Sequence, residues 1–175
     1  MTQHADAASS GIVVADAGPL IALARVEQLS LLAALYGQIV MPEGVLTELC
    51  LESHRPGARL LSDGFAQGLL RTHPLPADST AELARLRRVL DAGESAAILL
   101  AQVLACRFLL IDERRGRVMA RRRGIPVVGV AGVLLAAKRR GLLETVKPIL
   151  LALSRQGYRL SDALITEVLR LAEEV

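Results

Sequence analysis

Short apolar runs separated by helix-length segments constrain the fold of this chain more than any other feature. The clearest runs are residues 12–15, 39–41, 108–111 and 126–128, and a short or edge strand is expected at 69–72. The clear runs are apolar almost throughout instead of alternating with polar residues, which is typical of strands buried on both faces of a parallel sheet. The sequence therefore predicts an α/β fold with three layers, in which helices flank a central parallel sheet.

The segments between these runs carry the spacing of amphipathic helices. Pro42 suits the first turn of a helix, where its missing N–H is not needed, and Ser161 is a typical N-cap. We expect helices at 20–35 with a break near 26–30, and at 42–52, 58–66, 81–90, 94–104, 116–122, 131–140, 144–156 and 162–174. Residues 1–10 are expected to be a disordered lead, followed by one domain at 11–140 and its helical extension at 141–175.

Length and composition favour one soluble domain. The chain has 175 residues, of which 52% are hydrophobic and only 2% aromatic, so a large aliphatic core is expected. The apolar stretches are shorter than the roughly 20 residues of a membrane span, and the start lacks the pattern of a secretory signal. Cys50 and Cys106 stand far apart and the three histidines are scattered, which argues against a thiolate or imidazole metal site. We expect a cytoplasmic protein with reduced cysteines and no membrane partner.

Acidic residues follow two of the predicted strands and begin or occupy two of the helices. Asp16 follows residues 12–15, and Asp112 follows 108–111. Glu48 lies in the segment after the second strand, and Glu94 comes directly after Gly93. Each acid alone has an ordinary explanation, such as a helix cap or a solvated helix residue. As an ordered set, they are expected to meet where the carboxyl ends of parallel strands form a crevice.

Four carboxylates in one crevice would repel each other unless a cation lay between them. Hard oxygen ligands favour Mg²⁺ or Mn²⁺. Such an ion can orient a phosphodiester, activate water and stabilise the leaving oxygen. The acidic set thus points to metal-dependent phosphodiester chemistry.

Four sequence segments, in order along the chain, carry a resemblance to a known family. They are VADAGPLIAL at 14–23, MPEGVLTEL at 41–49, LDAGESAA at 90–97 and LIDERRGR at 110–117. Together they resemble the PIN-domain family, in particular its VapC-like members, over about residues 12–140. The helices that follow look like the extension of one VapC-like branch.

The resemblance implies a Mg²⁺- or Mn²⁺-dependent ribonuclease, often the toxin of a toxin–antitoxin pair, that acts as a dimer or larger assembly. Its partners would be an RNA substrate and a cognate antitoxin protein. Matched motif by motif, the metal-binding and catalytic acids would be Asp16, Glu48, Glu94 and Asp112, with Glu113 as an outside candidate. The family usually has Ser or Thr after the first Asp, whereas this chain has Ala17.

Positive charge is concentrated in one block of the sequence. Residues 107–140 hold ten basic and two acidic residues, a net charge of +8 within a chain whose total is +3. Arginine binds phosphate through its bidentate fork, so we expect contacts with nucleic acid from Arg114, Arg115, Arg117 and Arg121. The arginines of 121–123 and the basic residues of 138–140 also fit an ordinary role at helix C-termini.

Two other functions compete with the nuclease. A receiver-type signalling domain would need an acidic pair after the first strand, but alanines flank Asp16. A catalytically weak or inactive PIN-like module that only binds nucleic acid or protein is the alternative that Ala17 favours.

Overall fold

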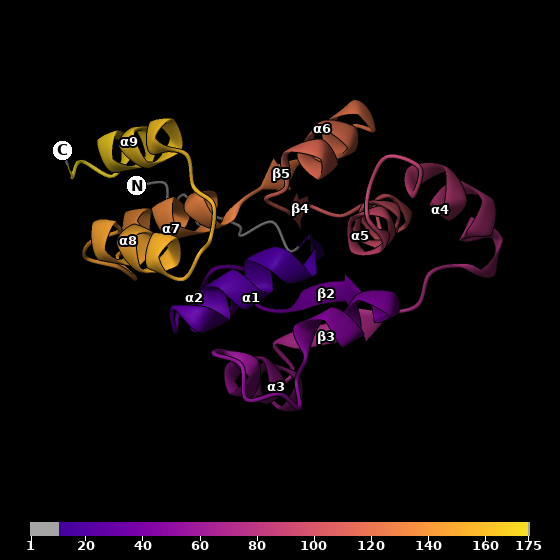
Figure 1. The fold of residues 1–175 in the computed structure, drawn as a ribbon, viewed down its shortest axis with the longest axis horizontal. Helices are drawn as coiled ribbons and strands as arrows, with labels where there is room; N and C mark the ends of the chain where they lie inside the picture. Colours follow the sequence, from indigo (N-terminus) through magenta and orange to yellow (C-terminus); the bar gives the residue numbers. More distant parts are fainter. Residues whose placement is uncertain (1–10, 175) are drawn as a thin grey trace, which may run out of the picture.

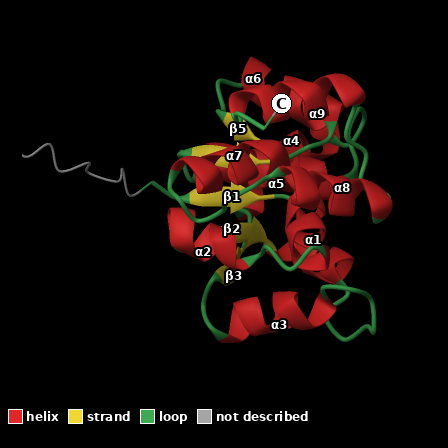
Figure 2. Ribbon diagram, turned by 90° about the vertical axis from the view of Figure 1, so that its left-hand side faces the viewer, coloured by secondary structure: helices red, strands yellow, loops and turns green. Residues whose placement is uncertain are grey.

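Five short parallel strands form the central layer of the structure, a computed structural model that describes residues 11–174 (Figures 1 and 2). They are β1 (Val13–Ala15), β2 (Ile39–Pro42), β3 (Leu70–His73), β4 (Phe108–Leu110) and β5 (Val127–Val128). Their order is β3-β2-β1-β4-β5, and every neighbouring pair is parallel. The predicted parallel sheet is confirmed, with β3 at one edge. The lead expected at 1–10 lies outside the described residues.

This strand order puts β1 in the centre and makes β1 and β4 the point where the chain changes direction across the sheet. The chain runs outward from β1 through β2 to β3, and then returns to β4 on the other side of β1. In open α/β sheets the crevice at such a switch point, beyond the carboxyl ends of the strands, is where ligands bind.

Helices cover both faces of the sheet. They are α1 (Ala17–Arg25), α2 (Ser30–Tyr36), α3 (Ala58–Ala66), α4 (Thr80–Leu86), α5 (Ala92–Val103), α6 (Arg114–Arg122), α7 (Val130–Arg139), α8 (Lys147–Arg155) and α9 (Asp162–Leu171), with short 3-10 helices η1 (Glu43–Leu49) and η2 (Ala77–Ser79). Val14 and Leu109 face one buried cluster with α4, α5 and α6, whereas Val13 and Leu110 face a second cluster with α1, α2 and α7. The three-layer prediction is confirmed.

The C-terminal helices belong to the same core as the sheet. Leu153 of α8 and Val168 of α9 are buried in the cluster that contains Val13. Glu174 accepts hydrogen bonds from the backbone of Val146 at 2.7 Å and from Lys138 Nζ at 2.6 Å. Lys138, one of the basic residues near the end of α7, therefore has a structural role.

One predicted helix differs from the structure in type, and others differ at their ends; those expected at 81–90 and 162–174 end at Leu86 and Leu171. The helix expected at 42–52 is instead the 3-10 helix η1, and Pro42 completes β2, where it pairs with His73. Gly44 and the β-branched side chains after it disfavour a regular α-helix here. The helix expected from residue 144 begins at Lys147. Pro148 favours the first turn of a helix, because the N–H that proline lacks has no partner within the helix there. The break predicted near 26–30 is confirmed between α1 and α2.

Within the described residues, no single helix is long and apolar enough to cross a membrane. Helices α1 and α2 reach the required length only when taken together, and they are bent by 119°. Cys50 and Cys106 are free and half-buried.

The packing predicts where substitutions cost stability. Leu109 is fully buried in β4, so Leu109→Ala should lower the free energy of unfolding by about 3 kcal/mol through lost contacts and a residual cavity. Urea unfolding measures the change. Leu151→Ala on α8, where the side chain is 45% exposed, is the matched control and should cost well under about 1 kcal/mol.

Candidate active site

Asp16 lies at the carboxyl end of β1, where it begins α1. Its backbone N–H donates to the carbonyl of Leu110 at 3.0 Å, which fixes it beside the end of β4. The residue is only 9% exposed. Burial raises the pKa of Asp16 to about 7; the backbone N–H of Ala17 opposes the shift, and the charges of Glu48, Asp91 and Glu94 add to it. Asp16, Glu48, Asp91 and Glu94 are thus close enough for their charges to interact.

Glu48 reaches this neighbourhood from η1. A Cβ atom at Gly93 would lie 2.5 Å from Glu48 Oε1, so glycine at the start of α5 is what admits the carboxylate. Burial raises the pKa of Glu48, and the charge of Asp91 raises it further.

Glu94 and Asp91 form a capping box at the N-terminus of α5. Asp91 Oδ1 accepts from the Glu94 backbone at 2.8 Å, and Glu94 Oε2 accepts from the Asp91 backbone at 3.2 Å. The other oxygen, Glu94 Oε1, is buried and has no hydrogen-bond partner among the described residues. Burial raises the pKa of Glu94, with further contributions from the charges of Asp91 and Glu113. Glu94 thus caps the helix with Oε2, while Oε1 has no hydrogen-bond partner among the described residues.

Asp112 follows β4, but protein donors engage its carboxylate. The hydroxyl of Tyr158 donates to Oδ2, and the backbone N–H of Val130, at the start of α7, donates at 3.1 Å to Oδ2 and 3.3 Å to Oδ1. Gly129 leaves room for Oδ1, because a Cβ there would clash with it. Burial raises the pKa of Asp112, although the Tyr158 and Val130 hydrogen bonds and the Arg117 charge act in the opposite direction.

Tyr158 donates to Asp112 and lies within the influence of the Asp16 charge. Burial, followed by the charge of Asp112, raises the pKa of its hydroxyl, so the hydroxyl keeps its proton and donates. The charge of Asp16 also acts on Tyr158. The loop after α8 therefore brings the Tyr158 hydroxyl to Asp112, near enough to Asp16 for the charge of Asp16 to act on it.

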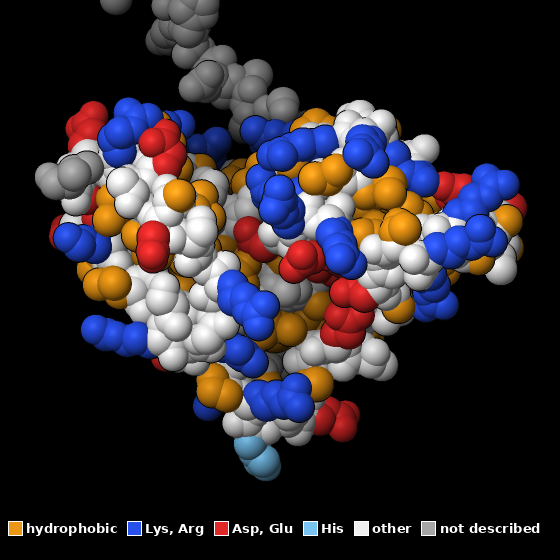
Figure 3. Space-filling view, turned by 45° about the horizontal axis from the view of Figure 1, so that its top comes forward, with side chains coloured by type: hydrophobic (Ala, Val, Ile, Leu, Met, Phe, Trp, Pro, Cys, Tyr) orange, Lys and Arg blue, Asp and Glu red, His pale blue; other side chains and the backbone are white. Residues whose placement is uncertain are grey.

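The predicted arginines divide into exposed and inward-facing side chains. Arg114, Arg115 and Arg121 are exposed on α6, and the charge of Arg115 lowers the pKa of Glu94. Arg117 is half-buried, and its Nη1 donates to the Ile111 carbonyl at 2.8 Å. Figure 3 shows acidic side chains gathered in the hollow of this face, with lysine and arginine side chains around them.

A family model described as a PIN domain matches residues 12–174, nearly the whole chain. The chain belongs to the PIN-domain family. A search of curated proteins and a search of solved structures each gave no match. PIN domains are generally nucleases and typically use divalent metal ions, so this membership indicates a nuclease-type function for the chain.

The donor chemistry of this PIN domain fits a divalent cation. Carboxylates from β1, η1 and α5 share one neighbourhood, their pKa values are raised, and Glu94 Oε1 is buried without a partner. A divalent cation at this place would reduce the repulsion between the carboxylates. It would also give Glu94 Oε1 a partner. In the described part of the chain, no three acidic, histidine or cysteine side chains already meet at metal-binding distances.

Sequence reasoning missed two residues of this site. Asp91 lies in the segment LDAGESAA at 90–97, and its place three residues before Glu94 is the pattern of a capping box. Tyr158 gave no such sign, because it lies 46 residues from Asp112 and meets it only through the tertiary fold.

The raised pKa of Asp16 predicts a pH-dependent stability. The folded state favours the protonated acid, so the metal-free protein should lose stability as pH rises from about 4 to about 7. Asp16→Asn should remove the part of this loss that is due to Asp16 and be more stable than the parent at pH 8 by about 3 kcal/mol. Urea unfolding at pH 5 and pH 8 in EDTA tests this. Asp78→Asn, at an exposed position, is the control and should follow the parent.

The Tyr158 hydrogen bond predicts a second stability effect. Tyr158→Phe removes a donor from the Asp112 carboxylate and should lower the free energy of unfolding by about 1–2 kcal/mol. Tyr36→Phe is a matched control, since the Tyr36 hydroxyl makes no hydrogen bond to another described residue. Equal effects of the two substitutions in denaturant unfolding would contradict the assignment.

Proposed function

We propose that this PIN domain is a metal-dependent endoribonuclease that cleaves RNA phosphodiester bonds with Mg²⁺ or Mn²⁺. Asp16, Glu48, Glu94 and Asp112 would hold the ion. The observation that carries the proposal is Glu94 Oε1, a buried carboxylate oxygen without a partner, in the neighbourhood of Asp16 at the switch point of the sheet. A capping box uses only one carboxylate oxygen of Glu94, so it gives no reason for the second oxygen to be buried without a hydrogen-bond partner.

The chain's own residues prepare this site for a phosphodiester. Asp16 and Glu94 present carboxyl oxygens at the carboxyl edge of the sheet, and Tyr158 with Val130 fixes the Asp112 carboxylate. When bound, a divalent cation supplies the charge that orients the phosphate, activates water and stabilises the leaving oxygen. Arg115, whose charge acts on Glu94, adds an exposed positive charge where the phosphate must approach.

We also propose that the protein is the toxin of a VapC-like toxin–antitoxin pair. The four ordered segments that resemble VapC-like proteins support this role. A cognate antitoxin protein would be its partner, and the active form would be a cytoplasmic homodimer or larger assembly. Expression in bacteria should arrest growth, and a small protein encoded directly upstream should relieve the arrest.

Ala17 supports a second candidate, a catalytically weak module that binds without cleaving. Ala17 is 2% exposed, directly after Asp16, and brings no hydroxyl to the site. Ala17→Ser restores that hydroxyl and would raise a weak activity if its absence is the limit.

A cleavage assay tests the nuclease. Purified protein is incubated with single-stranded and structured RNA in Mg²⁺, Mn²⁺ or EDTA. We expect cleavage only with metal, and a loss of at least about 100-fold in Asp16→Asn and Asp112→Asn. Glu94→Gln is the sharpest variant, because the amide oxygen can still accept from the Asp91 backbone while the negative charge is lost.

Asp78→Asn controls for a general charge effect and should retain full activity. Cleavage that persists in EDTA or in both aspartate variants would refute the metal-carboxylate mechanism. RNA binding without cleavage under any condition would instead support the binding module.

A further inference from the structure

A small hollow lies between α1 and the end of α8, beside the acidic site. Its volume is about 200 Å³. One wall is a single face of α1 with the spacing i, i+3, i+4 and i+7, formed by Gly18, Ile21, Ala22 and Arg25. A cavity of roughly 150 Å³ can hold benzene, so this hollow has room for a group of about one ring with a small substituent.

The opposite wall of the hollow is mostly apolar. Leu153 of α8 is fully buried there, and Tyr158 lines the hollow from the loop after α8. Gln156, the remaining residue of this wall, is exposed. Together with Ile21 and Ala22 on α1, the wall suits an apolar group of a ligand, because the burial of apolar surface is favourable.

Arg25 is the charged group of this hollow, and it lacks an acceptor. Its Nε is buried and has no hydrogen-bond partner among the described residues, a property it shares there only with Glu94 Oε1 of the acidic site. Its guanidinium also makes no ion pair within residues 11–174. The last turn of α1 is a favourable place for a positive charge, but that position gives the buried Nε no acceptor. A buried donor without a partner is costly, so it points to a ligand that supplies one.

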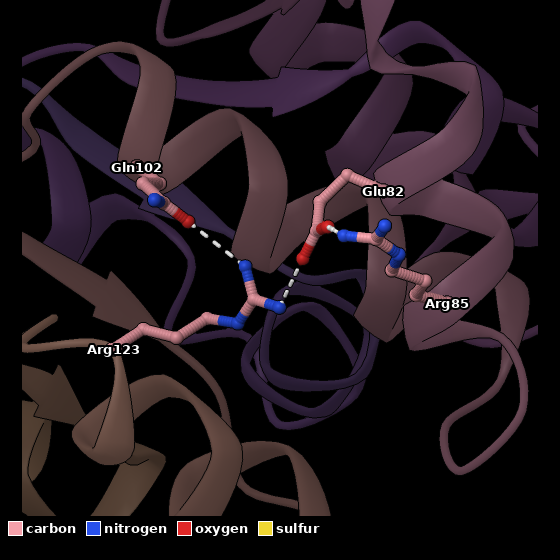
Figure 4. A network of polar contacts seen from close by, with 4 residues as sticks. All are labelled: Glu82, Arg85, Gln102 and Arg123. Atoms are coloured by element: carbon pink, nitrogen blue, oxygen red, sulfur yellow. Dashed lines mark hydrogen bonds and ion pairs between the residues drawn. The ribbon is translucent and has the colours of Figure 1, made fainter.

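The other half-buried arginines of the described chain both have acceptors. Arg123, at the end of α6, pairs with Glu82 of α4 and donates to Gln102 Oε1 of α5 at 3.0 Å (Figure 4). Arg117 donates to a backbone carbonyl at 2.8 Å. Where this chain takes a guanidinium partly out of water, it therefore supplies an oxygen, and Arg25 is the exception.

Acidic residues near Arg25 do not supply the missing acceptor. Arg25 also borders a second hollow, between α1 and α3, which Glu27 and Asp63 line. Neither acid pairs with Arg25 in the described part of the chain, and Asp63 instead lies 4.0 Å from Arg59 Nε. An acceptor for Arg25 would therefore come from a bound ligand.

The other end of the hollow disfavours a second negative charge. A Cβ atom at Gly18 would lie 3.9 Å from Asp16 Oδ2, so the Asp16 carboxyl group borders this end. A second carboxylate on the ligand would lie beside Asp16 and against apolar walls, and both are unfavourable. The hollow thus favours an anion with one charged end.

We propose that this hollow binds a small organic acid, with its carboxylate on Arg25 and a compact apolar body against Leu153 and Tyr158. Arginine is the side chain that pairs best with a carboxylate, and the volume limits the body to about one ring. Tyr158 also donates to Asp112, so the bound acid would contact a residue that shapes the acidic site. The inference goes beyond the proposed nuclease, because this binding needs neither RNA nor metal.

Three aromatic probes of similar size test the charge requirement. Amide NMR shifts of the full chain, in EDTA and at neutral pH, measure its affinity for benzoate, for the neutral benzamide and for the dicarboxylate terephthalate. Benzoate should bind about 10-fold or more tightly than benzamide, because only benzoate brings a charged acceptor to Arg25. Terephthalate should bind about 10-fold or more weakly than benzoate. The shifts should gather in α1, α8 and the loop after α8.

Two variants test the charged and the apolar parts of the hollow. Arg25→Gln should weaken benzoate binding about 10-fold and leave benzamide binding unchanged. Ile21→Phe fills the hollow and should block both probes. Arg59→Gln is the matched control, since its side chain is 94% exposed and borders only the neighbouring hollow on α3, and it should bind as the parent does. Thermal unfolding verifies that each variant is folded.

Four results would overturn the proposal. They are no saturable binding of benzoate, equal affinity for benzoate and benzamide, folded Arg25→Gln or Ile21→Phe proteins that bind like Arg59→Gln, and shifts that gather in α3 instead of α1 and α8. The proposed nuclease function can fail without any of these results, because no RNA or metal is present in the binding measurements.

Discussion

The removal of carboxylates from water at the carboxyl edge of the sheet is the constraint on which the rest of the site depends. Asp16 is held there by the central strand, and its raised pKa shows that burial outweighs the help it receives from the backbone. Natural proteins are only marginally stable, so such a cost must be offset elsewhere. Here the offset is the aliphatic core on both faces of the sheet, built around fully buried side chains such as Leu20, Leu100 and Leu109.

Helix N-termini and close-packed glycines make this edge possible. The start of α5 holds Asp91 and Glu94 in a capping box, and the start of α7 offers the Val130 N–H to Asp112. Amides and helix dipoles at these ends favour negative charge. Gly93 and Gly129 lie where a side chain would displace a carboxylate. The sheet sets where the acids lie, and the helix starts decide which of their oxygens have partners.

Local sequence patterns predict much of this structure, but they do not predict its long-range contacts. Apolar runs predicted the parallel strands, because buried strands need no alternation, and the acids after two of these runs were placed at the correct edge. The sequence does not predict that Glu48 lies in a 3-10 helix. Pro42 is compatible both with the end of a strand and with the start of an α-helix, and the prediction took the second. Arg117 could not be separated from its exposed neighbours, because only the fold shows that it turns toward the Ile111 carbonyl. The contact of Tyr158 with Asp112 depends on the burial of α8 in the core through Leu150 and Leu153, which no local pattern encodes.

The contact between Tyr158 and Asp112 also sets an order of events during synthesis. Asp112 leaves the ribosome well before the segment that completes its hydrogen bonds, because that segment lies 46 residues later. Until α8 and the loop after it have emerged and docked, the carboxylate lacks its hydroxyl donor. The acidic hollow is therefore finished late in translation, and a nascent chain that stops short of Tyr158 carries the acids without their final arrangement.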